Sequence, residues 1–275
     1  MKFDRMYCEI WHMRENMIDD LKEKILDADM VLVGIGEEFE VKETDIEKNE
    51  NYRSVLDICR SNEQLLPYIK KDFIENSADE AVLQRKRAYR QLFELIKDKN
   101  YFLVSLCMDG IIHETEFDEQ RIVEPCGTLK RMQCSNKCSD DLYPDDLFLA
   151  DKIRNVIKHK CGMNDIKLPI CPKCGKQLVF NNIFAENYAE EGYLPKWQLY
   201  TKWLQGTVNR KVCILEMGVG MRFPTVIRWP FEKVVYFNNK ASFFRIHSSL
   251  YQIAEEISER STGFEAAPLD FLINL

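Results

Sequence analysis

The 275-residue chain lacks an excess of basic residues, a long apolar run and an export signal. It has 38 basic and 45 acidic residues and a net charge of −7, whereas a nucleic acid or an anionic membrane attracts a basic face. The longest apolar run, Tyr101–Met108, is far shorter than the roughly 20 residues that span a bilayer. Residues 1–20 are too charged for a signal peptide. We therefore expect a cytoplasmic protein that binds neither nucleic acid nor membranes.

Ten cysteines are present, and five of them fall between residues 134 and 174. Without an export signal, a disulfide framework is not expected. Cys134 and Cys138 form one close pair, and Cys171 and Cys174 form another. Two pairs at this spacing can bring four thiolates to one tetrahedral zinc ion, which would be structural because no ligand position stays open. Cys161 could replace one ligand, and the alternative is a set of buried free cysteines.

Helical and strand-like patterns alternate along the chain. A helix over 14–27, a buried strand over 30–36 and a glycine turn follow one another, which is typical of α/β nucleotide-binding domains. The rest of the sequence predicts helices over 50–71, 80–98, 147–158, 195–206 and 250–260, and strands over 101–108, 121–123, 211–216, 233–237 and 242–246.

These patterns predict an α/β fold, a Rossmann-like parallel sheet with a helical insertion and a small zinc-ribbon module built on four cysteines. The Rossmann-like nucleotide-binding domain would comprise residues 1–39, 101–123 and 186–275. Residues 40–100 would form the helical insertion, and residues 124–185 the zinc-binding module.

Two glycine turns follow predicted strands, at Gly34–Gly36 and at Gly218–Gly220. The backbone N–H groups of such turns can bind phosphate oxygens. Two turns on neighbouring parallel strands would lie at one crevice, where α/β sheets bind ligands. Glu37 and Glu38 follow the first turn, and their charge would repel a pyrophosphate. Either turn could also serve packing alone.

The order of these features resembles that of the sirtuins, NAD-dependent protein deacylases and ADP-ribosyltransferases. In order along this chain, the features that resemble the sirtuins are a strand with Gly-x-Gly, a helical insert, a strand followed by Met-Asp-Gly, two cysteine pairs and a strand with Gly-Val-Gly-Met. Segments 133–138, 168–176 and 215–231 are similar to those of the macrodomain-linked bacterial branch, class M. The resemblance is close over 124–247 and covers the N-terminal third only in outline.

The resemblance implies that NAD or ADP-ribose binds between a Rossmann-type domain and a smaller zinc and helical part. Gly34 and Gly36 would then contact the pyrophosphate, and Asp109 the nicotinamide ribose. His247 would contact the adenine ribose in place of the family's Asn. The complete set of implied nucleotide contacts is Gly34, Gly36, Asp109, Gly218, Val219, Gly220 and His247.

Cysteine stands at two positions that are catalytic in the family. Cys107 replaces an Asn two residues before the retained Asp109, and Cys126 replaces the base, which is His in most members and Gln in class M. Cys126 could act as a base only as a thiolate, or it could be a nucleophile. The candidate catalytic residues are therefore Cys126, Cys107 and Asp109, whereas the alternatives make the two cysteines buried fillers or a redox pair. His113 is expected to be a structural hydrogen-bond donor rather than a base.

Three hypotheses for function follow from these residues. The first is a sirtuin-like protein that binds NAD or ADP-ribose without standard deacetylase activity. The second is an active NAD-dependent ADP-ribosyltransferase or deacylase with cysteine-altered chemistry. The third is an interaction protein that keeps the fold and the zinc but binds no nucleotide. The expected partners are a small-molecule nucleotide and a modified protein substrate or carrier protein.

Overall fold

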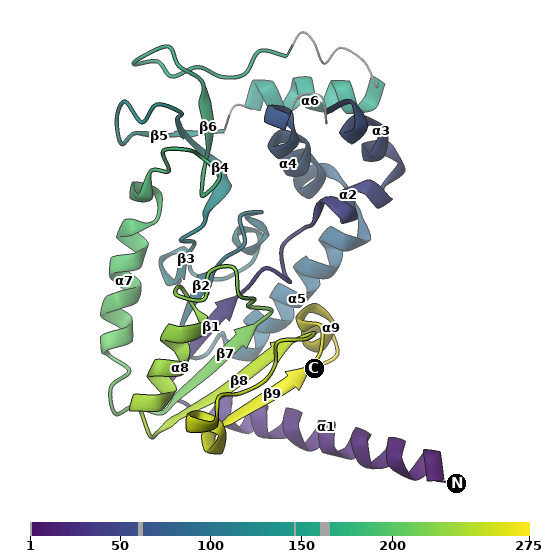
Figure 1. Cartoon of the computed structure of the whole chain (residues 1–275), viewed down its shortest axis with the longest axis vertical. Helices are drawn as coiled ribbons and strands as arrows, with labels where there is room; N and C mark the ends of the chain where they lie inside the picture. The colour runs from purple at the N-terminus through teal and green to yellow at the C-terminus, as the bar shows by residue number, and fades with distance from the viewer. Residues whose placement is uncertain (1, 60–62, 146, 160–165) are drawn as a thin grey trace.

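A six-stranded parallel sheet organises the computed structural model, which describes residues 2–59, 63–145, 147–159 and 166–275 (Figure 1). Along the sheet the order is β3-β2-β1-β7-β8-β9, the 3-2-1-4-5-6 order of doubly wound dinucleotide-binding domains. The order reverses between β1 and β7, and ligands of such sheets bind beyond the carboxyl ends of the strands at that point. The strands are β1 (Met30–Ile35), β2 (Asn100–Ser105), β3 (Ile122–Val123), β7 (Val212–Met217), β8 (Ala241–His247) and β9 (Ser261–Glu265).

Helices cover both faces of this sheet (Figure 1). Successive side chains of a strand point to opposite faces, so Val31 and Val33 of β1 belong to one apolar cluster while Leu32 belongs to the other. Burial on both faces explains why the strands are continuous apolar runs. The first cluster includes side chains of α1 (Lys2–Asp27), α5 (Glu80–Ile96) and α9 (Pro268–Ile273), and the second includes side chains of α7 (Leu194–Gln205) and α8 (Arg228–Phe237).

The segment between β1 and β2 is helical, as its charged and amphipathic sequence predicts. Instead of one helix over 50–71, the chain forms two, and Pro67 lies in the first turn of the second, where its missing N–H is tolerated. A later helix, α6 (Leu147–His159), packs on this layer through α3 and α4. The other helices are α2 (Glu43–Lys48), α3 (Glu50–Cys59), η1 (Glu63–Leu65) and α4 (Leu66–Asn76).

The cysteine-rich segment forms a second, antiparallel sheet in the order β5-β4-β6. The rings of Tyr68 in α4 and Phe180 in β6 lie 4.7 Å apart between centroids, so this sheet packs on the helical layer. Within the described ranges, no helix has the length and apolarity needed to cross a bilayer. The strands are β4 (Gly127–Cys134), β5 (Leu142–Pro144) and β6 (Leu178–Asn182), and short 3₁₀ helices lie at η2 (Ile111–Glu114), η3 (Glu119–Arg121), η5 (Glu190–Gly192) and η6 (Glu255–Arg260).

The prediction of a strand over 233–237 is wrong, because these residues are the last turns of α8. Phe231 and Val235, four residues apart, are both fully buried in the cluster on this face of the sheet. Burial at helical spacing therefore outweighs the local preference of two adjacent valines for a strand.

The helix predicted over 250–260 is limited to η6, which starts at Glu255. The backbone groups before it bond to side chains instead of to one another. Arg228 donates to Leu250 O at 2.7 Å and Arg245 donates to Gln252 O at 2.7 Å. These arginines hold the segment that precedes η6, in which residues 251–254 form neither helix nor strand.

Candidate functional site

The two glycine turns meet at the carboxyl ends of β1 and β7, as predicted. The Gly36 amide donates to Met217 O at 2.8 Å, and a Cβ on Gly36 would lie 2.2 Å from Gly218 O and from Val219 Cα. Only glycine fits at such an approach of two backbones. Gly218 has a φ of +65°, in the left-handed region. Both glycines are therefore required by the packing of one turn on the other.

Gly34 lies within the sheet rather than at its carboxyl end. It pairs with Val104 of β2 and Glu216 of β7. A Cβ at Gly34 would lie 2.5 Å from Ile227 Cγ2 and 2.8 Å from Phe231 Cε2. Gly34 therefore makes room for the side chains at the start of α8, and its contact with a pyrophosphate stays a prediction.

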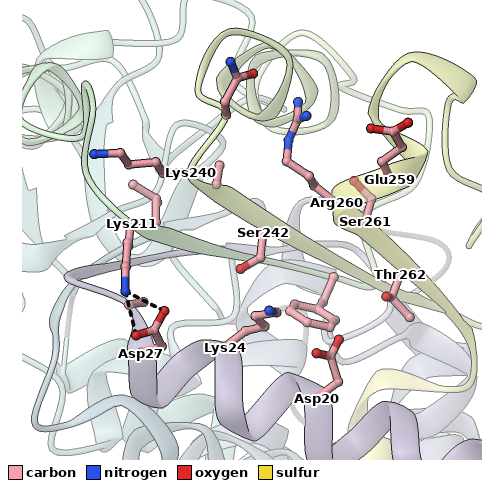
Figure 2. Close-up of a pocket in the computed structure, with 15 residues that line it drawn as sticks. Asp20, Lys24, Asp27, Lys211, Lys240, Ser242, Glu259, Arg260, Ser261 and Thr262 are labelled. Carbon is pink, nitrogen blue, oxygen red and sulfur yellow. Dashed lines mark hydrogen bonds and ion pairs between the residues drawn. The ribbon is translucent and has the colours of Figure 1, made fainter.

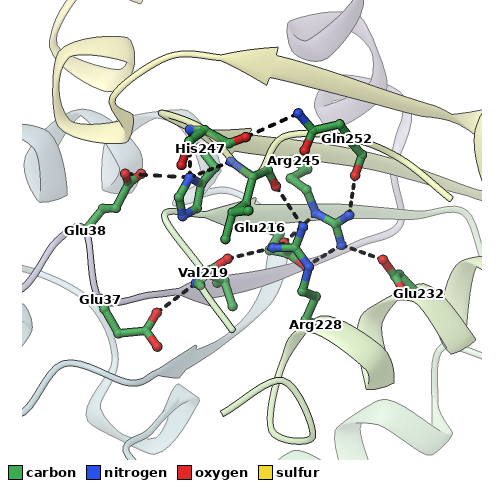
Figure 3. A network of polar contacts seen from close by, with 12 residues as sticks. Glu37, Glu38, Glu216, Val219, Arg228, Glu232, Arg245, His247 and Gln252 are labelled. Carbon is green, nitrogen blue, oxygen red and sulfur yellow. Dashed lines mark hydrogen bonds and ion pairs between the residues drawn. The ribbon is translucent and has the colours of Figure 1, made fainter. Parts of the chain in front are cut away.

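Glu37 and Glu38 bond to the loops that follow β7 and β8 (Figure 3). The Gly220 amide donates to Glu37 Oε2 at 2.8 Å. The Ser248 amide donates to Glu38 Oε2 at 3.2 Å, and the Ser248 hydroxyl donates to Glu38 Oε1. The two carboxylates thus accept hydrogen bonds at the end of the sheet where the sequence predicts a phosphate.

His247 ends β8 beside this acidic pair. Its Nδ1 lies 3.6 Å from Glu38 Oε1 and accepts the amides of Ser249 and Leu250, each at 3.0 Å. Burial lowers the pKa of His247 despite the neighbouring Glu38 carboxylate. An Nδ1 that accepts two N–H groups carries no proton, so His247 is neutral at pH 7 and shapes the loop after β8.

A buried ion network holds the loops that follow β7 and β8 (Figure 3). Glu216 and Arg245 are register partners in β7 and β8, joined by contacts of 2.5 Å and 3.1 Å. Arg228 of α8 donates to Val219 O at 2.8 Å and to Leu250 O at 2.7 Å. None of these three residues was predicted from the sequence. For Glu216 and Arg245 the signal was a single charged residue in each of two otherwise apolar strands, since such charges are buried only when paired, whereas Arg228 lies at the start of α8 and carries no such signal.

Cys107 and Asp109 follow β2 and fasten the segment after β1. The Cys107 thiol donates to Gly36 O at 3.3 Å. The Asp109 carboxylate accepts the amides of Val41 at 3.2 Å and Ile111 at 3.1 Å. Burial raises the pKa of the Cys107 thiol, aided by the charge of Asp109, and burial also raises the pKa of Asp109. Both side chains therefore form hydrogen bonds with backbone groups.

Cys126 lies between β3 and β4 and is 3 % exposed. Burial, with the negative charge of Glu37 next in importance, raises the pKa of its thiol to about 12, although Arg222 opposes the shift. A reactive cysteine instead has a pKa below its usual range of about 8.5 and a positive environment. The surroundings of Cys126 therefore keep the thiol protonated.

His113, on η2, bridges two carboxylates. Nδ1 lies 2.7 Å from Glu119 Oε1, and Nε2 lies 2.7 Å from Glu124 Oε2. Burial opposes protonation of the imidazole, but the bonds to Glu124 and Glu119 outweigh it and raise the pKa of His113 to about 9. His113 is therefore a charged structural donor that fixes Glu124, two residues before Cys126.

The four paired cysteines converge on one point in the second sheet. Their sulfurs all lie within 4.8 Å of one another. Cys134 Sγ lies 3.4 Å from Cys174 Sγ, and Cys138 Sγ lies 3.6 Å from Cys171 Sγ. Tight turns set this arrangement, since Lys137 and Gly175 have φ values of 42° and 70°.

This cluster fits a structural zinc ion. Four thiolates at a Zn–S distance of about 2.3 Å stand about 3.8 Å apart in a tetrahedron, which is close to the spacing of the sulfurs. Backbone N–H groups of Cys174 and Lys173 outweigh the effect of burial and lower the pKa of Cys171 to about 6, whereas the hydrogen bond with Cys174 and burial raise the pKa of Cys138 to about 12. The fit to zinc therefore rests on the positions of the four sulfurs. Cys161, the alternative ligand, lies outside the described residues.

Two pockets lie at the opposite, amino ends of the strands. One, of about 570 Å³, is lined by α1 and the starts of β7, β8 and β9, and carries charged side chains of both signs (Figure 2). Lys211 in this pocket is already paired with Asp27 at 2.8 Å. The other, of about 770 Å³, lies between α7 and the starts of β1 and β2. Neither pocket includes a residue that the sequence analysis selected.

The chain is similar in sequence to two curated proteins, although it matches no family model. A protein ADP-ribosyltransferase of Staphylococcus aureus is 26 % identical over 179 residues, which are 64 % of this chain and 56 % of that protein. A probable bifunctional ADP-ribose hydrolase/ADP-ribosyltransferase of Fusarium oxysporum is 28 % identical over 131 residues, 46 % of this chain and 22 % of that protein. The chain thus spans about half the length of the first relative and about a fifth of the second.

Solved structures of Sir2 proteins share the fold. A structure from a study of the mechanism and regulation of Sir2 enzymes has a TM-score of 0.55 at 13 % identity, covering 94 % of this chain and 96 % of that one. A mutant Sir2 homologue in complex with 2′-O-acetyl ADP ribose has a TM-score of 0.51 at 10 % identity, covering 93 % and 94 %. The chain therefore has the sirtuin fold, a Rossmann-like sheet with a zinc-type cysteine module.

Proposed function

We propose that the chain is a sirtuin-like protein that binds NAD or ADP-ribose at the carboxyl ends of β1, β7 and β8. The observation that carries the proposal is the meeting of the Gly36 and Gly218 turns where the strand order reverses. Such a point is the ligand site of doubly wound sheets. The fold shared with a Sir2 homologue solved with 2′-O-acetyl ADP ribose supports the same choice of ligand.

Under this proposal, the chain does not carry out sirtuin-type deacylation. A base for that reaction must be able to take a proton near neutral pH. Cys126, at the position of the family's base, is a buried thiol with a pKa of about 12 beside Glu37. Cys107, at the position of the family's Asn, uses its hydrogen on Gly36 O. Retained Asp109 is engaged by two backbone amides.

A second candidate is favoured by sequence similarity. Both curated relatives are named as ADP-ribosyltransferases, and the Staphylococcus protein aligns over 64 % of this chain. The chain would then transfer ADP-ribose from NAD to a modified protein or carrier protein. A Sir2 protein of the same fold was solved bound to acetylated peptide, with a TM-score of 0.51, which supports a protein as the acceptor.

Zinc is the metal that we assign to Cys134, Cys138, Cys171 and Cys174. Four thiolates complete the tetrahedral shell, so no position is left for a substrate or a reactive water. The ion would hold the turns that carry the cysteines and would take no part in nucleotide chemistry.

Calorimetry and a product assay separate these candidates. The zinc-loaded chain is titrated with ADP-ribose and with NAD, and nicotinamide release from NAD is followed by chromatography. Binding without nicotinamide release is the outcome that the proposal predicts. Release coupled to modification of an acceptor protein would instead establish the transferase. A folded, zinc-loaded chain that binds neither nucleotide would be an interaction protein on a sirtuin scaffold.

A further inference from the structure

Donors at the proposed nucleotide site are already occupied by the chain's own carboxylates. The Gly220 amide donates to Glu37, and the amide and hydroxyl of Ser248 donate to Glu38. Gly220 and Ser248 lie on the loops after β7 and β8. Backbone N–H groups at such turns are the donors that bind phosphate oxygens in nucleotide-binding folds. A carboxylate oxygen, like a phosphate oxygen, is an anionic hydrogen-bond acceptor.

The segment that carries the two carboxylates is fixed at several points. The Gly36 amide donates to Met217 O, and the Val41 amide donates to Asp109. Arg85 of α5 donates to Phe39 O at 2.7 Å and to Glu40 O at 2.8 Å. A buried arginine, 5 % exposed, therefore clamps the backbone next to Glu38. The side chains of Glu37 and Glu38 are therefore held at the carboxyl ends of β7 and β8, where they are partly buried.

The side chains that could supply positive charge near Glu37 and Glu38 are engaged by other groups. His247 beside Glu38 is neutral, because its Nδ1 accepts two backbone amides. Arg228 donates to two carbonyls, Val219 O and Leu250 O. Arg222 lies over the rings of Phe184 and Phe223, at 5.2 Å and 5.1 Å from the ring centroids. Both arginines are held by other groups, so an approaching pyrophosphate would still meet the two carboxylates, which accept hydrogen bonds from Gly220 and Ser248.

We infer that Glu37 and Glu38 are internal competitors of the phosphate groups and set the specificity of the site. A diphosphate-containing nucleotide binds only by displacing both carboxylates from Gly220 and Ser248, whereas a ligand without phosphate meets no such competition. The inference rests on the proposed function, since it concerns the same loops. The acidic pair would keep the affinity for ADP-ribose low relative to the affinity for its nucleoside part.

The test compares ADP-ribose with adenosine in matched variants. The native chain, Glu37→Gln, Glu38→Gln and the double variant are each titrated by calorimetry with both ligands. Glutamine keeps the size and an acceptor oxygen but removes the charge. The double variant should bind ADP-ribose at least about tenfold more tightly than the native chain, with adenosine affinity unchanged. Glu23→Gln, an exposed position on α1, makes the same charge change elsewhere and should leave both affinities as they are.

The outcomes separate this inference from the proposed function. Equal ADP-ribose affinity in the native chain and the double variant would overturn the inference and leave the function standing. A loss of ADP-ribose binding in the charge-neutral variants would also overturn it, because the carboxylates would then be part of the site. Absence of binding in every protein would overturn both. If the double variant does not fold, the two single variants decide the question by the same comparison.

Discussion

At the scale of single residues, the question is whether Cys126 can take a proton. A thiol with a pKa of about 12 is ionised in roughly one molecule in 10⁵ at pH 7, so it offers almost no thiolate. The acidic neighbour Glu37 works in the same direction as burial. Under the proposed function, Cys126 fills space at the position that the resemblance to sirtuins assigns to a base.

Cys126→Ala should accordingly behave like the native chain with NAD, which means binding without nicotinamide release. The substitution removes one buried sulfur, so a small loss of unfolding free energy, roughly 1 kcal/mol, is expected. The two effects are measured by a product assay and by denaturant unfolding. Nicotinamide release by the native chain that is lost in a folded Cys126→Ala variant would show that the thiol takes part in chemistry.

His113 should make the stability of the fold depend on pH. Its pKa is about 9 in the folded chain and 6.5 in the unfolded chain, so its stabilisation is complete below pH 6.5 and is lost as pH rises through 9. The shift corresponds to roughly 3 kcal/mol at most. The native chain should therefore be more stable than His113→Gln, and the difference in unfolding free energy should be larger at pH 6 than at pH 10. A difference that is the same at both pH values would contradict the ion pairs with Glu119 and Glu124.

At the scale of elements, the cysteine module depends on a metal that joins two turns. Freshly purified protein should contain about one zinc ion per chain. Cys171→Ala should lose the zinc and melt at a lower temperature, because metal binding contributes to folding. Cys213→Ala, a buried cysteine of β7, is the matched control and should keep the zinc. A metal content near zero in the native chain would refute the assignment.

The sequence predicts most elements of the sheet because buried parallel strands are continuous apolar runs. Apolar runs of this kind coincide with β1, β2, β7 and β8. The pattern failed at 233–237, where tertiary burial of Phe231 and Val235 outweighs strand propensity. It also failed at β9 (Ser261–Glu265), whose sequence STGFE has a glycine and little apolar character.

The candidate site was predictable in position but not in detail. The two glycine turns could be placed side by side because strand ends in a parallel sheet share an edge. The role of Gly34 beneath α8, and the bonds of Glu37 and Glu38 to Gly220 and Ser248, depend on contacts between residues about 180 or more positions apart. Local sequence carries no information about such pairings.

At the scale of the whole molecule, the two ends of the sheet carry different groups. The carboxyl ends of β1, β7 and β8 carry the glycine turns, the acidic pair and His247 (Figure 3). The amino ends carry a pocket beside α1 with charged groups of both signs (Figure 2). Doubly wound sheets bind ligands at the carboxyl ends. We therefore propose that the nucleotide binds at the carboxyl ends of β1, β7 and β8.

The most direct measurement is an NMR titration of the isotope-labelled, zinc-loaded chain with ADP-ribose. The account predicts saturable shifts of the backbone amides of Gly36, Gly218, Gly220 and Ser248. The amide of Lys211, at the amino end of β7, should not move. Shifts confined to the pocket beside α1, or no shifts at saturating ligand in a folded chain, would contradict the proposed nucleotide site.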